Sequence, residues 1–405
     1  MLKIVRVYHH LKTKQKIIRV ICAATLLWAM AYACFEYFVP LFLEGKGYSI
    51  STIGLLLGIP SFIAIGLDVF IGYLQTKIKA KWLFLFSLTL LIAASLLIYL
   101  YGGMIGIIIF ALVLYGLGFD FFDITNYSSV FRNSDETNSS SNISLRDTFE
   151  ALGLVIGGIF VGYAFSENPG QTILITALFM FLSFLIILFL YKEPWRNSEI
   201  KVKNKWLSVI TDFKKIRSKQ MLFVLFVMVC ITFWDGLFWG FESIFANKFV
   251  NPYINESVFA GMLMAIYLLP MVLFEHLFGI AEDRIGKKKF IYGGFLVLAI
   301  GITLIAISQN IFLLTFAVFL TSTGIFAITW PAILGWYEDK TALLLGRNNA
   351  GKAVGIIEFF ENIGYLLGPI FGGLIVLKLG FQGTFFIMGG LFLVLAITSF
   401  FVLKK

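Results

Sequence analysis

The sequence predicts an all-α membrane protein with twelve transmembrane helices in two halves of six. Three observations predict this fold: the composition, the number and length of the apolar stretches, and the uneven placement of the basic residues. Of the 405 residues, 59% are hydrophobic and 14% are charged, whereas soluble domains have about 45–50% apolar and about 25% charged residues. A soluble chain of this length could not bury so much apolar surface, which excludes globular, fibrous and disordered proteins.

Twelve apolar stretches are long enough to cross a bilayer, whose hydrocarbon core of about 30 Å needs roughly 20 helical residues. They cover residues 20–43, 51–74, 83–101, 104–129, 146–165, 172–191, 221–246, 257–280, 289–307, 310–335, 353–377 and 382–402. The sequence favours helices over a transmembrane β-barrel, because barrel strands would show ten-residue alternations instead of long apolar runs. We therefore expect a multi-pass protein of the plasma membrane of the cell.

The basic residues predict the orientation of these helices, because loops rich in Lys and Arg stay in the cytoplasm. With both termini cytoplasmic, 29 of the 32 Lys and Arg residues fall on the cytoplasmic side, and only Lys46, Lys248 and Lys378 fall outside. This split also accounts for the net charge of +9. The basic segments are expected to contact anionic lipids of the inner leaflet, not nucleic acid.

The longest polar segment, residues 192–219, is expected to be a basic cytoplasmic linker between two domains. The first domain is the N-terminal six-helix half at 1–191, and the second is the C-terminal six-helix half at 220–405. We expect a chain of this design to act as a monomer.

The two halves resemble each other at an offset near 206 residues. Trp28 and Glu36 in the first stretch match Trp234 and Glu242 in the seventh. Chance can produce one such match, but several occur in chain order along the two halves. Internal duplication of this kind is typical of secondary transporters.

A loop motif follows the eighth apolar stretch, where residues 279–289 read GIAEDRIGKKK. It consists of Gly279, the pair Asp283 and Arg284, then Gly286 and three lysines. This pattern resembles the loop signature of the major facilitator superfamily. The resemblance extends over the whole chain in the number and grouping of the helices.

The equivalent loop after the second stretch keeps Gly72 and the basic residue Lys77. It has Thr76 in place of the aspartate and Lys79 in place of the second glycine. The resemblance implies that the two loops, with the ends of the neighbouring helices, form a cytoplasmic gate. The gate residues that it implies are Gly72, Lys77, Asp147, Gly279, Asp283, Arg284, Gly286 and Glu358.

Small residues at intervals of four predict close packing of helices in lipid, where apolar attraction between helices is weak. Such residues occur in the fifth and eleventh stretches, and the family's antiporters show a similar glycine pattern in the fifth. The packing residues are Gly153, Gly157, Gly364, Gly368, Pro369 and Gly372. A second, compatible interpretation is a sliding contact that opens and closes the cytoplasmic mouth.

Acidic residues inside the apolar stretches are candidates for the substrate and proton pathway. An ionisable side chain within a transmembrane segment is costly unless it faces a cavity or a partner. Together with two tryptophans that could stack on a sugar ring or a cation, the candidates are Glu36, Asp120, Asp123, Glu150, Asp235, Glu242, Glu361, Trp28 and Trp234. The alternatives are neutralisation by loop Lys and Arg for the acids, and simple packing for the aromatic residues.

Asp120, Asp123 and Glu150 are expected to lie at similar depth and to face one vestibule. Asp120 and Asp123 share one helix face, because they are three residues apart. Three carboxylates in a medium of low dielectric constant would not all stay ionised unless Arg146 or a substrate cation compensated. A carboxyl in that position can bind and release a proton, so the expected coupling ion is a proton.

The leading function is secondary active transport of a small organic solute across the cytoplasmic membrane by alternating access. Because acids outnumber bases in the stretches, the expected substrate is cationic, zwitterionic or neutral, such as a drug-like compound or a sugar, and not an anion. The alternative is a membrane receptor or sensor built on a transporter fold, without net transport.

No enzyme, cofactor or metal site is expected from the sequence motifs. Residues 346–353 come close to a phosphate-binding loop, but Ala353 lacks the hydroxyl group that would bind magnesium. Cys22, Cys34 and Cys230 lie in apolar stretches and show neither zinc spacing nor a disulfide framework. They are expected to fill space in the core.

Overall fold

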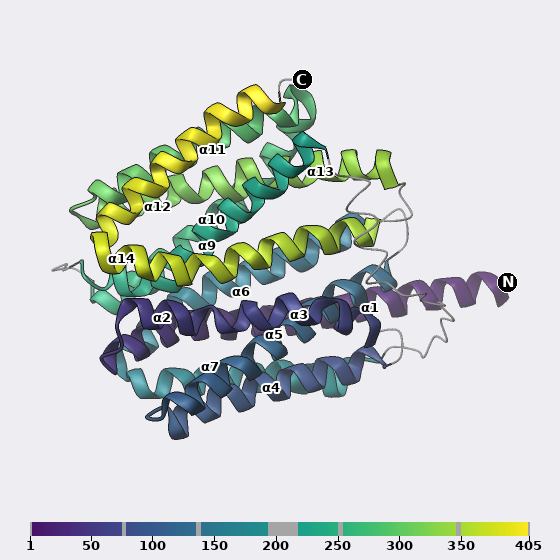
Figure 1. Ribbon diagram of the computed structural model, residues 1–405. Coiled ribbons are helices and arrows are strands. Elements are labelled where there is room, and N and C mark those ends of the chain that lie inside the picture. The colour runs from purple at the N-terminus through teal and green to yellow at the C-terminus, as the bar shows by residue number, and fades with distance from the viewer. Residues whose placement is uncertain are drawn as a thin grey trace. The chain divides into compact units, whose positions relative to one another are not determined.

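The computed structural model describes residues 2–74, 78–134, 139–192, 218–249, 254–345 and 350–403. All regular structure in these ranges is helical, as Figure 1 shows. The elements are α1 (Leu2–Gly45), α2 (Ile50–Leu57), α3 (Ile59–Leu74), α4 (Ala80–Tyr101), α5 (Ile105–Asn133), α6 (Ser139–Glu167), α7 (Pro169–Leu190), α9 (Lys219–Ala246), α10 (Glu256–Ile285), α11 (Lys287–Ile307), α12 (Ile311–Ser322), the π-helix η1 (Thr323–Thr329), α13 (Trp330–Leu345) and α14 (Ala350–Leu403).

The predicted apolar stretches coincide with these helices. Within the described ranges, 10 helices are long and apolar enough to cross a membrane. The last of them lies in α14, which contains the last two predicted stretches. Those two meet at Gly380, whose φ of 71° and ψ of 174° interrupt the helix. The second predicted stretch is divided into α2 and α3, which meet at Gly58. The prediction of an all-helical membrane fold is therefore confirmed.

Polar residues mark the starts of several helices. The side chains of Ser49, Asn168, Ser218 and Asn310 each accept a hydrogen bond from the backbone N–H three residues further on. A helix leaves its first N–H groups without partners inside the helix, and such caps satisfy one of them. Pro169 follows the cap of α7 at the first helical position, where its missing N–H costs nothing.

The backbone conformation explains why the second glycine of the loop motif, Gly286, is a glycine. Gly286 ends α10 with a φ of 107°, and its N–H donates to the carbonyl of Glu282 at 2.8 Å. A side chain is strained at positive φ, which favours glycine there. Lys79, at the equivalent place before α4, has a φ of −62° and an extended backbone. The two loops therefore differ in backbone conformation as well as in sequence.

The helices divide into two compact units. The first consists of Met1–Phe38 and Gly66–Lys201, and the second of Val39–Ile65 and Val202–Lys405. Residues 39–65 lie with the second unit because α2 packs on α14.

In the first unit, α4 packs on both α5 and α7. The Ser87 hydroxyl donates to the carbonyl of Gly118 across the α4–α5 contact at 2.8 Å. The Lys81 ammonium donates to the carbonyl of Leu188 at 2.6 Å, near the end of α7. A cation suits that position, because the last carbonyls of a helix carry partial negative charge.

In the second unit, α14 packs on α9 and α11, and α10 packs on α12 and η1. The Thr329 hydroxyl donates to the carbonyl of Gly324 within η1 at 2.6 Å. The Ser322 hydroxyl, at the end of α12, donates to the carbonyl of Tyr267 in α10. Short π-helical segments interrupt the regular ladder and are frequent near functional sites.

The glycines with four-residue spacing lie in close contacts between helices. A Cβ built on Gly153 of α6 would lie 2.4 Å from the carbonyl oxygen of Leu26 in α1. In the second unit, a Cβ on Gly368 of α14 would lie 2.4 Å from the carbonyl oxygen of Phe233 in α9. Each stripe thus lets one helix approach the backbone of another within its own unit.

Replacing Gly368 with valine is expected to destabilise the second unit by about 1–3 kcal/mol, because overpacking forces α14 away from α9. Gly390 is the matched control, since it lies on the same element and a Cβ there has no heavy atom within 4 Å. The midpoint of thermal unfolding in detergent is measured for both variants. A Gly368→Val midpoint as high as that of Gly390→Val would contradict the close contact.

Candidate functional site

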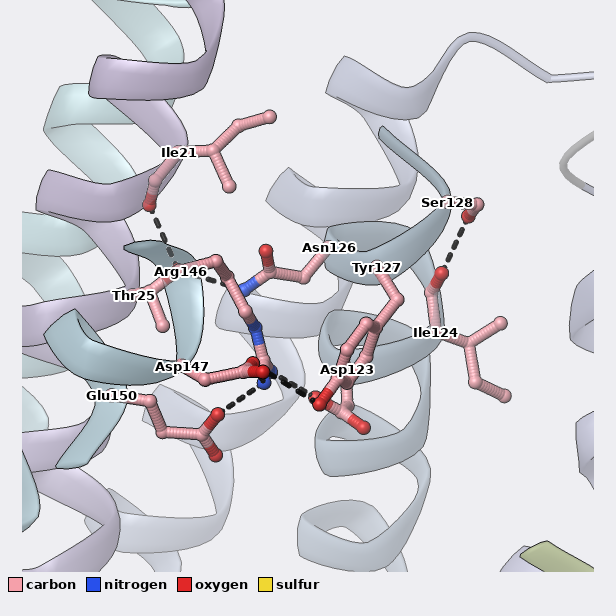
Figure 2. Close-up of polar contacts among 10 residues, drawn as sticks. All are labelled: Ile21, Thr25, Asp123, Ile124, Asn126, Tyr127, Ser128, Arg146, Asp147 and Glu150. Atoms are coloured by element: carbon pink, nitrogen blue, oxygen red, sulfur yellow. Dashed lines mark hydrogen bonds and ion pairs between the residues drawn. The ribbon is translucent and has the colours of Figure 1, made fainter. Parts of the chain in front are cut away.

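A buried ion cluster in the first unit is centred on Arg146 of α6, whose side chain is only 2% exposed. Its guanidinium pairs with Asp123 of α5 and with Asp147 and Glu150 of α6. The distance from Nη1 to the Asp147 carboxylate is 3.0 Å, and Glu150 lies one turn further along the helix. Figure 2 shows the three carboxylates converging on one guanidinium.

Tyr127 completes the cluster from α5. Its ring lies under the Arg146 guanidinium, with 4.0 Å between the guanidinium carbon and the ring centroid. Its hydroxyl donates to the Asp147 carboxylate at 3.2 Å. A planar guanidinium suits this place, because it can stack on a ring while its N–H groups point outward to carboxylates.

The polar contacts continue toward α1. The Asn126 amide donates to the Thr25 hydroxyl at 2.7 Å, and that hydroxyl donates to the carbonyl of Ile21 at 2.8 Å. Both side chains are fully buried, so this link fixes α5 against α1 (Figure 2). Asp123 is therefore held on a helix that is tied to α1 by buried hydrogen bonds.

The charges of the cluster do not balance when every group is ionised. One guanidinium faces three carboxylates, which leaves two negative charges in excess. Buried charge is tolerated when it is paired and hydrogen-bonded, and an unpaired buried carboxylate is costly. A proton or a cation that joins the cluster therefore relieves an existing imbalance.

Glu36 of α1 lies in an aromatic part of the same unit. It is partly buried and close to the Tyr115 hydroxyl of α5. The Tyr115 ring stacks on Phe35, with 3.6 Å between their centroids. Trp28 is fully buried and stacks on Phe122, with centroids 4.6 Å apart.

Asp235 of α9 is the centre of a second polar cluster, in the second unit. It is 5% exposed. Two tyrosines clamp its carboxylate: the Tyr267 hydroxyl of α10 donates to Oδ1 at 2.9 Å, and the Tyr365 hydroxyl of α14 donates to Oδ2 at 2.8 Å. Asp235 thus joins three helices of the unit.

Glu242 lies two turns further along α9 and is also 5% exposed. Its Oε1 has no hydrogen-bond partner among the described residues. Trp234, the counterpart of Trp28, is fully buried and stacks on Phe238 at a centroid separation of 5.5 Å. Glu242 is seven positions after Asp235, about two helical turns, so both lie on one side of the helix.

The remaining pathway candidates lie elsewhere on these helices. Asp120 is buried on α5, one turn before Asp123, and Glu361 is partly buried on α14. The tyrosines at positions 127, 267 and 365 were not predicted, because tyrosine spacing alone gives no signal in a chain with 16 of them.

The structure describes only part of the predicted gate. Asp147 is bonded to Arg146, Glu358 is partly buried on α14, and Arg284 is exposed near the end of α10. Gly286 has the positive φ given above. Lys77 lies outside the described residues, and for Gly72, Gly279 and Asp283 only the helical backbone is described.

The three cysteines are buried and free. No group of three or more His, Cys, Asp or Glu side chains that could hold a metal ion occurs among the described residues.

Curated relatives of this chain include a probable nitrate transporter and a multidrug resistance protein. It is 23% identical over 384 residues to the probable nitrate transporter NarT of Staphylococcus epidermidis, with 93% of each chain covered. It is 27% identical over 145 residues to multidrug resistance protein 2 of Bacillus subtilis, a match that spans 36% of this chain and only 35% of that protein.

Solved structures show the same fold over nearly the full length. The nucleoside transporter NupG superposes with a TM-score of 0.77 at 14% identity, covering 96% of this chain and 99% of that one. A POT family transporter superposes with a TM-score of 0.74 at 13% identity, covering 96% of both chains.

The family comparison covers nearly the whole chain and both halves of it. The model for the Major Facilitator Superfamily matches residues 21–246 and again residues 243–405. The chain therefore belongs to the Major Facilitator Superfamily, and it is a multi-pass membrane transporter of a small molecule and not an enzyme.

Proposed function

We propose that this transporter moves a small organic solute across the cytoplasmic membrane by alternating access and that a proton drives it. The observation that carries the proposal is the cluster of Arg146 with Asp123, Asp147 and Glu150. One guanidinium cannot neutralise three carboxylates, so the cluster favours uptake of a proton. A change in the exposure of the cluster to one side of the membrane or the other would then load and release that proton.

The distribution of buried charge supports an organic solute that is cationic, zwitterionic or neutral. Arg146 is the buried base of the described residues, and its charge is already committed to three carboxylates. In the part of the chain that the structure describes, Glu36, Asp235 and Glu242 add acid without a paired base. An anion such as nitrate would meet no unpaired positive charge there, although one relative is named a probable nitrate transporter.

The proposed mechanism also includes the cytoplasmic gate and the topology that were predicted from the sequence. The six-helix halves at 1–191 and 220–405 rock about the substrate site, with the basic segment 192–219 joining them on the cytoplasmic side. Both termini are cytoplasmic, and Asp283 and Arg284, at the end of α10, belong to the cytoplasmic gate. The exposed Arg284 and the positive φ of Gly286 support a turn that presents charge at the membrane surface.

Uptake into proteoliposomes tests the proposal. Radiolabelled choline, glycine betaine, uridine and nitrate represent a cation, a zwitterion, a neutral solute and an anion. We expect at least one of the first three to accumulate when a pH gradient is imposed and to equilibrate without one. Movement of nitrate alone, or accumulation that is independent of the gradient, would contradict the proposal. A receptor without transport would move none of the four above the level of empty liposomes.

A further inference from the structure

The three acids of the Arg146 cluster differ in the hydrogen bonds that they accept. Oδ1 of Asp147 accepts from two side chains, namely from Nη1 of the guanidinium at 3.0 Å and from the Tyr127 hydroxyl at 3.2 Å. Asp123 and Glu150 are each paired with the guanidinium, and neither accepts a hydrogen bond from another side chain among the described residues. Asp147 is therefore the acid with two donors, one of which carries no charge.

Exposure to water does not distinguish these acids. The side chains of Asp123 and Asp147 are each 31% exposed, and that of Glu150 is 22% exposed. The three carboxylates therefore lose a similar amount of hydration in the folded protein. A hydrogen bond donated to an ionised carboxylate favours the ionised form. The additional donor on Asp147 thus decides which acids of the cluster are left to bind a proton.

Tyr127 is held where its hydroxyl reaches Asp147. The stacking of its ring on the guanidinium, with 4.0 Å from the guanidinium carbon to the centroid, fixes the ring on the α5 side of the contact with α6. The hydroxyl then bridges to Asp147, which is the residue next to Arg146 on α6 (Figure 2). Phenylalanine at this position would keep the ring and lack only the hydroxyl, so the hydroxyl can be tested separately from the stacking.

Few other titratable groups lie around Tyr127 and Asp147. Cys22 of α1 lies close to the guanidinium, and its thiol is buried. Asp120 of α5 is buried one turn before the cluster. The helices α4 and α7, which pack on α5 and α6, together contain one charged residue, Lys81, whose ammonium is bonded to the end of α7. Within the described residues, the second donor to Asp147 is therefore a neutral hydroxyl and not a second base.

We propose that Tyr127 is a positioning residue of the proton site, because its hydroxyl keeps Asp147 ionised as the counter-ion of Arg146. The exchangeable proton is then shared by Asp123 and Glu150. The inference rests on the proposed function and assigns the proton within it. One guanidinium and three carboxylates carry two negative charges in excess, and one of these is neutralised when a proton from water on one side of the membrane binds. The same proton is released to water on the other side, while the pair of Arg146 and Asp147 stays intact.

Infrared difference spectroscopy of the purified full-length protein in lipid tests this assignment. A step from pH 8 to pH 5 gives a C=O band for each carboxyl group that takes up a proton. Acids elsewhere in the chain contribute to the spectrum of every variant, so their bands cancel when two spectra are subtracted. The component that is lost in Glu150→Gln identifies the band of the proton site.

The hydroxyl and the carboxylate are then removed singly and together. Tyr127→Phe is expected to gain a carboxyl component comparable in amplitude to the one that Glu150→Gln loses, because Asp147 can then be protonated as well. This gained component is expected to disappear in the double variant Tyr127→Phe/Asp147→Asn. With Tyr127 present, Asp147→Asn is expected to change the band much less. The cycle isolates the coupling between the two groups.

Tyr163→Phe is the matched control. Tyr163 lies on α6 outside the cluster and is 57% exposed, so the change removes a tyrosine hydroxyl from the same unit. The spectrum of this variant is expected to equal that of the unmodified protein. Thermal midpoints close to that of the unmodified protein show that the variants are folded.

The proposal is overturned if Tyr127→Phe gives the spectrum of the unmodified protein, or if the component that it gains persists in the double variant. These results are separate from those on transport, because the spectra need no transported solute. A protein that accumulates solute with a pH gradient but shows no gain in Tyr127→Phe keeps the proposed function and loses this assignment. A protein that shows the gain but moves no solute keeps the assignment and loses the proposed function.

Discussion

Replacing Arg146 with methionine is expected to destabilise the first unit by about 3 kcal/mol at pH 8, because the change leaves three partly buried carboxylates without their partner. Methionine has a similar length and fills most of the vacated space, so loss of packing contributes little. The affected groups are Asp123, Asp147 and Glu150, all paired with this one guanidinium. Thermal or denaturant unfolding in detergent measures the loss.

The pH dependence of this loss gives a second readout. At pH 5 Asp123 and Glu150 of the variant can take up protons, which removes two of the unpaired charges, so the loss is expected to be smaller there than at pH 8. Arg19 is the matched control, because it is a base of the same unit on an exposed face of α1. Arg19→Met is expected to change stability by less than about 0.5 kcal/mol. An Arg146→Met variant within about 1 kcal/mol of the unmodified protein at pH 8 would show that the ion pairs contribute little.

Replacing Asp123 with asparagine, or Glu150 with glutamine, is expected to abolish accumulation driven by a pH gradient while sparing exchange. Each amide keeps the shape of the side chain but cannot take up or release a proton. With one proton per solute, a gradient of one pH unit supports about tenfold accumulation, and this ratio should fall to about one in either variant. Exchange of internal for external solute needs no net proton movement and should continue.

The measurement uses proteoliposomes and whichever of choline, glycine betaine or uridine the unmodified protein accumulates. Glu167→Gln is the control, because Glu167 is an exposed acid at the end of α6, the same helix as Glu150. It is expected to accumulate solute normally. If both amide variants still concentrate solute with unchanged pH dependence, these two acids are structural and the proton pathway lies elsewhere, with Asp235 and Glu361 as the next candidates.

The fold was largely predictable because the bilayer imposes it. Helices of about 20 apolar residues must satisfy their own backbone hydrogen bonds in lipid, so the apolar stretches gave the helices directly. The interruptions were less predictable: Gly380 was one of 37 glycines, and only its positive φ shows that it divides α14. The π-helical turn at Thr323–Thr329 depends on packing against α10 and α11, which no local pattern encodes.

The site was predictable only in part. Helical spacing placed Asp147 and Glu150 on one face, and the count of acids required compensation from Arg146 or from a substrate cation. The structure shows Arg146 paired with them and with Asp123. A contact between α5 and α6 depends on how the two helices pack, and sequence spacing within one helix does not report it.

The tyrosine partners of Asp235 illustrate the same limit. Tyr267 and Tyr365 lie 32 and 130 residues from Asp235 along the chain, and each comes from a different helix. The sequence therefore indicated Asp235, because an acid within an apolar stretch is unusual. Its tyrosine partners could be identified only from the packing of α9, α10 and α14 in the structure. In the same way, the free oxygen of Glu242 distinguishes it from Asp235 only in the structure.

Proton movement during transport tests the central claim most directly. The unmodified protein is reconstituted with a pH-sensitive dye trapped in the lumen, and the transported solute is added outside without any imposed gradient. Proton coupling through the Arg146 cluster predicts a change of luminal pH that begins when solute enters. The rate of this pH change should be proportional to the rate of solute entry, and the change should disappear in Glu150→Gln. Solute entry at an undiminished rate with constant luminal pH in the unmodified protein would contradict the claim.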